Sequence, residues 1–344
     1  MVEEVGRVGL VLLFFILGLD FPLRRIGEIS RRVWSAGLMD LAANCLLLLV
    51  VGLLFGLDFL TAFTIATVAY ATSSSITVKM LEEKKRLAGP ESEYLLALLI
   101  FEDLASPLLV SVLFGLQRDG ALSLSLLGLL VLKIIVLLGL ALGAGAFLFS
   151  RLKSFFARYL REDFLPPFLV GLALGYAGLA VWLGLSEVLG AFLAGVMLAE
   201  SEHAGPLENL LLSLRDLTLP FFFFWFGSSL RWAGGISSWT LLTVMLLLAT
   251  LGKLFAVYAG GRKFGLSPRV SARAALSSNT RGEFSIVAAS LAAVELKLLC
   301  GVFITVSALL GVVLFNLAPP LSAWFQKKFF PAPSAISERS GAGR

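Results

Sequence analysis

The sequence predicts an all-α, polytopic membrane protein with about eleven transmembrane helices. Apolar residues make up 58% of the 344 residues and charged residues only 15%, against roughly 45–50% and 25% in soluble domains. The mean hydropathy is +0.92. The apolar stretches are continuous and rich in Leu, Ala and Gly, so they do not fit the alternating strands of a membrane barrel.

About eleven stretches are long enough to cross a hydrocarbon core of roughly 30 Å as helices. In chain order they cover approximately 5–21, 33–56, 59–78, 93–116, 122–149, 165–183, 185–200, 214–230, 236–260, 270–293 and 298–325. Glu3 and Glu4 replace the basic start of a cleavable signal peptide, so the first span is expected to be retained. We expect residues 1–330 to form a single transmembrane domain and residues 331–344 a disordered cytoplasmic tail.

The positive charges predict the orientation. Most of the 28 lysines and arginines fall on every second loop, as in the groups Arg24, Arg25, Arg31, Arg32; Lys79, Lys84, Lys85, Arg86; Arg151, Lys153, Arg158, Arg161; and Arg262, Lys263, Arg269, Arg273. By the positive-inside rule these loops are cytoplasmic, which places the N-terminus outside and the C-terminus in the cytoplasm of a multi-pass cell-membrane protein. The net charge of +5 then reports topology, and no nucleic-acid partner is expected.

Side chains that bind metals or act as nucleophiles are scarce. Two cysteines, Cys45 and Cys300, and one histidine, His203, are too few for a zinc site, a disulfide framework or Ser-His catalysis. We therefore expect no cofactor, no transition metal and no enzymatic activity. His203 falls on a predicted cytoplasmic loop, where it is either solvated or a pH sensor.

Two distant segments resemble each other. Those starting at Glu4 and Ser213 each have a cation near the start, a Phe-rich middle and then a glycine, Gly18 or Gly227. A polar cluster follows each at a similar spacing. Because an odd number of spans separates them, the two segments run in opposite directions, which predicts the inverted repeat of secondary transporters. Chance similarity between two Phe-rich helices is the alternative.

Two adjacent carboxyls, Glu102 and Asp103, lie about nine residues into a predicted span, where a charge costs at least about 2.5–3.5 kcal/mol. Side chains of adjacent helical residues point about 100° apart, so one carboxylate can pair with a fixed cation while the other exchanges solutes. A carboxylate that binds a proton and an alkali ion by turns is a minimal exchanger. A buried structural acid pair is the alternative.

Lysines also fall inside predicted spans. Lys253 has more than one helical turn of apolar sequence on either side. An ion pair with Glu102 or Asp103 would keep it charged, and the alternative is that it snorkels to the cytoplasmic surface. For Lys133, pairing with Asp40 and snorkelling are both open.

Polar residues interrupt two spans at matched positions of the repeat, 71–75 and 277–283. Hydroxyls and amides there can satisfy the backbone of unwound helices, whose opposed ends supply carbonyls for a cation and amide dipoles for acids. The alternative is two intact helices in which Ser and Thr bond back to i−4 carbonyls. We expect Arg281 and Glu283 to pair with each other or with core groups rather than with substrate.

The chain resembles the monovalent cation:proton antiporters of the Kef-type and sodium/hydrogen exchanger class. Matching stretches cover almost the whole chain in family order, among them GLVLLFFILGLDFPLRRIG, ATSSSITVKMLEE, LLIFEDLASPLL, LGLSEVLGAFLAGVMLAES, LRDLTLPFFFFWFGSSL, LGKLFAVYAGG and SSNTRGEFSIV. The resemblance implies that Asp103 is the essential ion- and proton-binding carboxylate, Glu102 the preceding acid and Lys253 the pairing lysine. It also implies two unwound crossing helices, lined by Thr72, Ser73 and Ser74 and by Asn279, Thr280, Arg281 and Glu283.

The same resemblance implies a moving core, a dimerising scaffold and a helix that links them. The core would comprise 33–116 and 236–325, the scaffold 1–32 and 165–232, and the linker helix 122–150. Two departures stand out: the family commonly has Asp, Asn or Gln where this chain has Glu102, and it has two further helices before the first span. Ion preference and stoichiometry therefore do not carry over.

These features together predict a secondary antiporter, a homodimer in the lipid bilayer, that exchanges Na⁺ or K⁺ for H⁺ by competition at Asp103. Movement of the core against the scaffold would change the side that the site faces. A sodium-coupled organic-solute symporter is one alternative, although it needs a polar cavity where residues 221–224 suggest an apolar wall. A non-transporting membrane sensor or partner protein is another. An intramembrane aspartyl protease is disfavoured, because two acids on one turn cannot flank a scissile bond.

Overall fold

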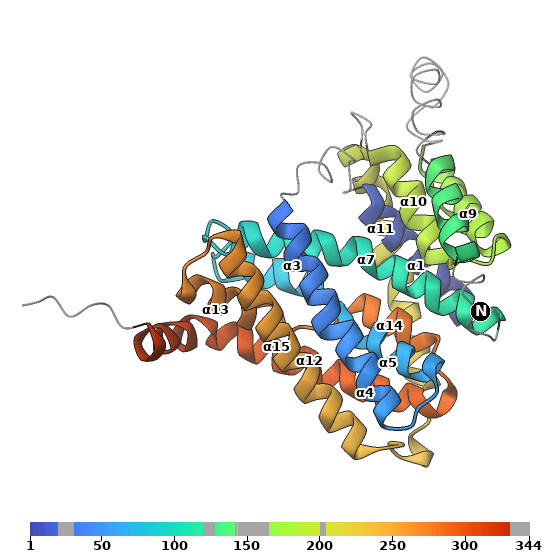
Figure 1. Ribbon diagram of the computed structural model, residues 1–344. Coiled ribbons are helices and arrows are strands. Elements are labelled where there is room, and N and C mark those ends of the chain that lie inside the picture. Colours follow the sequence, from blue (N-terminus) through green and yellow to red (C-terminus); the bar gives the residue numbers. More distant parts are fainter. Residues whose placement is uncertain (20–30, 120–127, 142, 144–164, 200–203, 331–344) are drawn as a thin grey trace, which may run out of the picture.

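The computed structural model describes residues 1–19, 31–119, 128–141, 143, 165–199 and 204–330, and these contain helices and turns but no strand. The predicted all-α class is therefore confirmed (Figure 1). Six helical segments of the described chain are long and apolar enough to cross a membrane, and two shorter apolar helices are Gly128–Ala141 and Glu187–Ala199. The count of about eleven spans stays a prediction, and His203 and the tail lie outside the described residues.

The described helices overlap the predicted spans, with two main differences: the helix that ends at Ser229 begins at Ala204 and not at 214, and the described helix within the predicted span 122–149 is Gly128–Ala141. In chain order they are α1 (Val2–Leu19), α3 (Arg31–Leu41), the π-helical turn η1 (Ala42–Leu46), α4 (Leu47–Leu54), α5 (Phe59–Tyr70), α6 (Ser74–Glu83), α7 (Ser92–Asp119), α9 (Leu165–Trp182), α10 (Glu187–Ala199), α11 (Ala204–Ser229), the 3₁₀ turn η2 (Trp232–Gly234), α12 (Trp239–Phe264), α13 (Pro268–Leu276), α14 (Glu283–Ser290) and α15 (Val294–Phe329).

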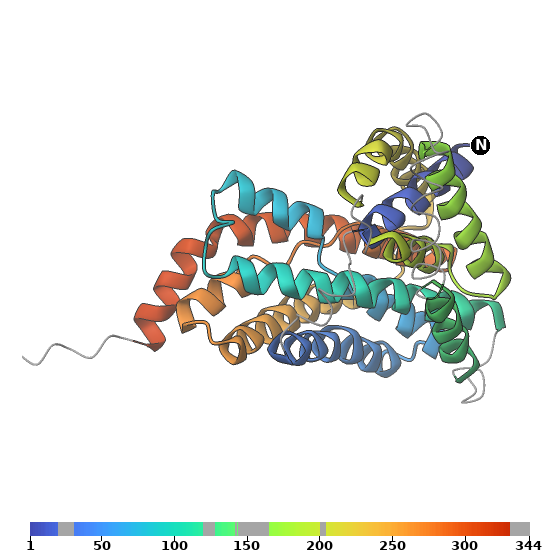
Figure 2. The same ribbon diagram turned by 90° about the horizontal axis from the view of Figure 1, so that it is seen from above.

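The helices form two groups. Helices α1, α9, α10 and α11 pack on one another at one end of the molecule, and we call them the peripheral group (Figures 1 and 2). Helices α3 to α7 and α12 to α15 form the crossing group, in which α12 lies along α3 and α14 packs against α5. The crossing group contains both segments whose helices are interrupted.

Glycines set the spacing within the peripheral group, where α1 crosses α10. A Cβ on Gly18 would lie 2.1 Å from the Phe192 carbonyl oxygen, and one on Gly195 would lie 2.0 Å from the Phe15 carbonyl oxygen. Small residues allow this close approach in membranes, where van der Waals packing drives helix association. The predicted repeat aligns Gly18 with Gly227, but a Cβ on Gly227 would meet no described atom within 4 Å. Gly18 therefore lies in a close helix contact and Gly227 does not.

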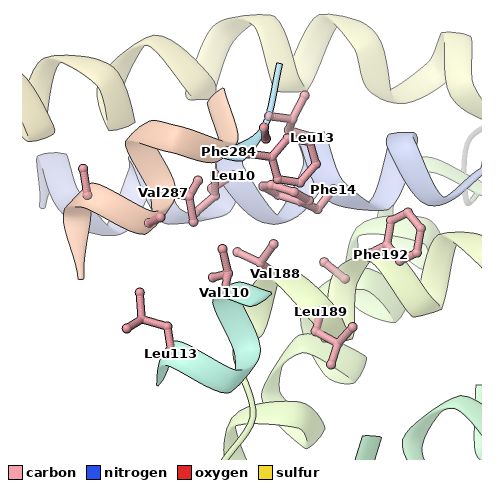
Figure 3. Close-up of a cluster of buried hydrophobic side chains, with 14 of the residues drawn as sticks. Leu10, Leu13, Phe14, Val110, Leu113, Val188, Leu189, Phe192, Phe284 and Val287 are labelled. Carbon is pink, nitrogen blue, oxygen red and sulfur yellow. The ribbon is translucent and has the colours of Figure 1, made fainter. Parts of the chain in front are cut away.

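The two groups meet over an apolar surface (Figure 3). Phe14 of α1 packs edge-to-face on Phe284 of α14, with ring centroids 4.9 Å apart. Val110 of α7 and Val188 of α10 belong to the same buried cluster. A second buried cluster, which includes Val257, takes its described members from the crossing group alone. Part of the crossing group therefore has a core of its own.

Helix caps determine where the half-helices begin. The Ser73 hydroxyl accepts the Ile76 N–H at 3.3 Å at the start of α6, and the Ser267 hydroxyl accepts the Val270 N–H at 3.4 Å at the start of α13, with Pro268 in its first turn. Such residues satisfy N–H groups that have no partner in the helix itself. Local sequence therefore favours a helix start at each of these positions.

A buried ion cluster connects the loop before α7 to α13. Glu91 is fully buried, lies 3.0 Å from Arg86 and also pairs with Arg273 of α13. Arg86 also donates to the Ser277 hydroxyl at 2.9 Å and stacks over the Phe315 ring. Burial lowers the pKa of the Arg86 guanidinium, and Glu91 opposes that effect. The sequence placed these residues on loops and did not predict the cluster.

Glu91→Gln should therefore destabilise the protein, because two arginines would then face each other without a counter-charge. We expect a loss of about 2–3 kcal/mol, below the 3–5 typical of fully buried pairs, because the arginine side chains keep 12% and 22% exposure. Thermal unfolding in detergent measures the loss. Glu93→Gln, two residues along and exposed, is the matched control, and equal melting temperatures for both variants would contradict the expectation.

Candidate functional site

Two spans of the crossing group are broken in the middle. Residues 71–73 separate α5 from α6, and residues 277–282 separate α13 from α14. The predicted discontinuous helices are confirmed, and the alternative of intact helices is excluded. Both breaks coincide with the polar clusters of the sequence, because Ser, Thr and Asn side chains satisfy the backbone groups that unwinding exposes.

The two breaks hydrogen-bond to each other. The Ser73 N–H donates to the Thr280 carbonyl at 2.8 Å, and the Thr72 hydroxyl donates to the Ser278 carbonyl at 3.1 Å. The hydroxyls of Thr77 and Thr280 lie 3.1 Å apart and share a hydrogen bond. Backbone groups freed in one helix are thus satisfied by the other, as a low-dielectric environment requires.

The crossing is too tight for a side chain at Gly282. A Cβ there would lie 2.4 Å from the Ser73 Cβ and 2.5 Å from its hydroxyl oxygen. Gly282→Ala should therefore force the breaks apart, at a cost of about 1–3 kcal/mol, the range for overpacking. Thermal unfolding tests this, with Gly227→Ala as the control because no described atom lies within 4 Å of a Cβ there. Equal changes in the two variants would count against a steric origin.

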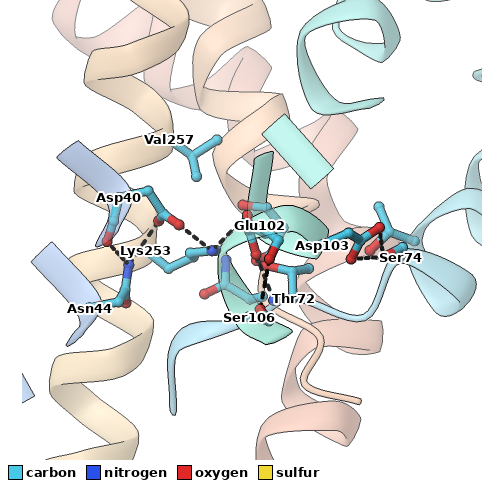
Figure 4. A network of polar contacts seen from close by, with 12 residues as sticks. Asp40, Asn44, Thr72, Ser74, Glu102, Asp103, Ser106, Lys253 and Val257 are labelled. Carbon is cyan, nitrogen blue, oxygen red and sulfur yellow. Dashed lines mark hydrogen bonds and ion pairs between the residues drawn. The ribbon is translucent and has the colours of Figure 1, made fainter. Parts of the chain in front are cut away.

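The adjacent carboxylates of α7 have different partners (Figure 4). Glu102 is fully buried, and its Oε2 accepts the Thr72 N–H at 2.7 Å. Asp103 is 6% exposed, and the Ser74 hydroxyl oxygen lies 2.6 and 2.7 Å from its two carboxylate oxygens. Glu102 is thereby bonded to the break between α5 and α6, and Asp103 to the first turn of α6.

Lys253 of α12 lies between two carboxylates. Its Nζ is 2.9 Å from Glu102 Oε1 and 2.7 Å from Asp40 Oδ2, and all three side chains are fully buried. The expected ion pair with Glu102 is present, and snorkelling is excluded. Pairing of Asp40 with Lys133 was wrong, because Asp40 is held by Lys253.

The depth of these residues could have indicated the correct partner. Asp40 and Lys253 each lie about seven residues from the cytoplasmic end of their predicted spans, and therefore at about the same depth in the membrane. Lys133 lies about sixteen residues from the corresponding end of its predicted span. Counted from that end, its level differs from the level of Asp40 by about nine residues, which is more than about 10 Å at 1.5 Å per residue. Lys253 is therefore the better-matched partner for Asp40 in depth.

Arg281 and Glu283 bond to core groups instead of to each other. Glu283, the first residue of α14, accepts from the hydroxyls of Ser73 at 2.9 Å and Ser75 at 2.7 Å. A carboxylate at a helix N-terminus is stabilised by the helix dipole. Arg281 is 2% exposed, donates to the Ala249 carbonyl of α12 at 3.4 Å and interacts electrostatically with Glu102 and Asp40.

Asn279 adds a buried acceptor to the crossing. Its Nδ2 donates to the Ala275 carbonyl at 2.7 Å, whereas its Oδ1 has no hydrogen-bond partner among the described residues. With the Asp103 carboxylate and the Ser74 hydroxyl, the crossing contains carboxylate, hydroxyl and amide oxygens. Oxygen donors of these kinds suit hard cations, and a carboxylate can bind a proton as well.

Comparisons with known proteins agree with this architecture. The family model "Sodium/hydrogen exchanger, transmembrane" matches residues 1–324. The chain is 47% identical to the ammonium/H⁺ antiporter subunit AmhT of Alkalihalophilus pseudofirmus over 98% of this chain and 86% of that protein. It is 31% identical to the K⁺/H⁺ antiporter subunit KhtU of Bacillus subtilis over 90% of this chain and 78% of that protein.

A solved structure has the same fold. The sodium proton antiporter MjNhaP1 from Methanocaldococcus jannaschii superposes with a TM-score of 0.64, covering 93% of this chain and 85% of that one, at 16% identity. A match at this identity establishes the fold alone. The interrupted helices, the buried carboxylates and the family match lead to one conclusion: this chain is a multi-pass membrane protein of the sodium/hydrogen exchanger family, the monovalent cation:proton antiporters.

Proposed function

We propose that this antiporter exchanges a monovalent cation, Na⁺, K⁺ or ammonium, for H⁺ by competition at the Asp103 carboxylate. The observation that carries the proposal is the contact between Asp103 and the Ser74 hydroxyl at the helix crossing. Glu102, its neighbour, is committed to Lys253 and to the Thr72 N–H. The adjacent acids thereby have separate roles, one structural and one in substrate binding.

The chemistry at Asp103 follows from its neighbours. A deprotonated carboxylate accepts the Ser74 hydroxyl hydrogen bond and can also coordinate a cation. The Ser74 hydroxyl then supplies a neutral oxygen, and we propose the Asn279 amide oxygen of the other break as a second one. Protonation removes the negative charge and with it most of the attraction for the cation. Because the two substrates bind alternately, a gradient of either one drives the other in the opposite direction.

For access to both sides of the membrane, we assign the crossing group as the moving core and the peripheral group as the scaffold. An apolar surface between the groups supports this assignment. The hydrogen bonds that cross it among the described residues include the Ser186 N–H to the Ser111 hydroxyl at 3.2 Å and Arg118 to the Val181 carbonyl at 3.4 Å, and these would have to break when one group slides on the other. The positive-inside pattern supports an external N-terminus. A homodimer within the bilayer, built on the scaffold, completes the proposal.

Flux measurements test the proposal. Purified protein in proteoliposomes with an outward proton gradient should take up labelled Na⁺ or Rb⁺, and ammonium should compete if it is a substrate. Choline, which is too large for an oxygen-lined ion site, should neither be transported nor compete. If none of the small cations moved with protons, the proposal would be wrong.

A further inference from the structure

We infer that Asp40 is a positioning residue for the exchange: it keeps Lys253 in an ion pair throughout the cycle, so that one cation exchanges for one proton with no net movement of charge. This inference rests on the proposed competition at Asp103. Asp40 lies near the end of α3, on neither of the broken helices. It is a third buried carboxylate beside the two of α7.

The backbone around Asp40 holds its carboxylate against Lys253. Oδ2 lies 2.7 Å from Lys253 Nζ, and Oδ1 accepts the Asn44 Nδ2 at 2.8 Å. Asn44 lies in the π-helical turn η1, a distortion that is frequent at functional sites. Helix α12 passes close to this turn: a Cβ on Gly252 of α12 would lie only 2.8 Å from the Ala43 carbonyl oxygen, so the glycine allows the approach.

Lys253 forms ion pairs with two carboxylates, and each carboxylate is hydrogen-bonded to a different part of the fold (Figure 4). Glu102 is bonded to the crossing through the Thr72 N–H, whereas Asp40 is bonded to Lys253 and to η1. The Tyr70 ring lies 5.7 Å from Nζ and covers it further. A change at the crossing that disturbs Glu102 thus leaves the lysine paired with Asp40. Two carboxylates also favour the charged lysine more strongly than one does.

The buried charges around the site sum to a single negative charge, which one proton or one monovalent cation can neutralise. Among the described residues, the buried charged side chains outside the Glu91 cluster are Asp40, Glu102, Asp103, Lys253 and Arg281. Glu283 is left out of this balance because it is partly exposed and its carboxylate is stabilised separately by the Ser73 and Ser75 hydroxyls and by the N-terminus of α14. Three carboxylates against two cations leave one excess negative charge. One proton or one monovalent cation neutralises it, so the two loaded forms of the site carry the same charge. Without Asp40 both loaded forms would be positive, which a low-dielectric environment opposes.

The distribution of ions at equilibrium tests the stoichiometry. Proteoliposomes containing the wild-type protein receive a proton gradient, whichever of Na⁺ or Rb⁺ is transported, and a membrane potential of either sign set by a thiocyanate gradient. The cation accumulation ratio should equal the proton ratio at every potential. If one charge moved per cycle, 100 mV would shift the accumulation ratio by up to about fifty-fold, which would overturn the inference. A complete absence of flux would instead overturn the proposed function.

Variants test the role of Asp40 directly. Asp40→Asn removes the charge at nearly constant size, and the apparent KM for the cation should rise about tenfold or more because the empty site is no longer negative. Asn44→Ala removes the hydrogen bond but keeps the charge, and its KM should stay within about threefold of wild type. An unchanged KM in Asp40→Asn, or an equal rise in both variants, would overturn the positioning role. If Asp40→Asn does not fold, the wild-type accumulation ratio still decides.

Discussion

Asp103→Asn should reduce cation-driven proton flux to the level of protein-free liposomes, with little change in stability. Asparagine has nearly the shape of aspartate and can still accept the Ser74 hydrogen bond, so we expect a stability change within about 1 kcal/mol. It cannot bind a proton at neutral pH, and it offers a cation only a neutral oxygen. The variant therefore loses both substrates at once while it keeps the contacts of the crossing.

The measurement is proton flux in proteoliposomes, with thermal unfolding in detergent as the check on folding. Asp216→Asn is the matched control, because this aspartate of α11 has a side chain that is 64% exposed and pairs with the neighbouring Arg215. The control should transport at the wild-type rate. Retained pH-dependent cation flux in a well-folded Asp103→Asn protein would remove Asp103 from the proposed mechanism.

Lys253→Met should be among the most destabilising substitutions in the chain. Methionine fills most of the lysine volume but removes the ion-pair partner that Asp40 and Glu102 share, which leaves both carboxylates buried with only Arg281 as a more weakly coupled cation. Removal of one partner from a buried ion pair typically costs about 3–5 kcal/mol. On the scale of a few degrees per kcal/mol, the melting temperature should fall by roughly 10 °C.

Two further variants separate charge from packing. Lys263→Met, at an exposed position near the end of α12, should leave the melting temperature nearly unchanged. The double variant Lys253→Met with Asp40→Asn should be more stable than Lys253→Met alone, because it removes one of the two uncompensated carboxylates. A double variant no more stable than the single one would mean that lost packing, and not lost charge compensation, explains the effect.

The fold class and the breaks in both helices were predictable because each depends on residues near one another in the chain. Spans follow from runs of apolar residues, whose length must match the bilayer. The breaks follow from clusters of Ser, Thr and Asn, together with the cap at Ser73. The separate partners of Glu102 and Asp103 follow from the angle between adjacent residues of one helix.

The partner of Asp40 was not predictable in the same way. Its pairing depends on α12 lying beside α3, and hydropathy does not specify which helices are neighbours. The Glu91 cluster was missed for a related reason, since loop residues read as solvated until α13 places Arg273 beside them. Arg281 and Glu283 are two positions apart, yet they bond to different elements of the crossing.

Sequence alone therefore determined that the chain crosses a membrane as helices, where two of those helices unwind, and that two adjacent carboxylates fall within an apolar helix. These properties arise from the cost of exposing polar groups to hydrocarbon, which acts on each segment separately. Tertiary structure alone decided that Lys253 lies between Asp40 and Glu102 and that the two breaks satisfy each other. Those contacts join residues from separate helices, and only the packing of the bundle brings them within hydrogen-bonding distance.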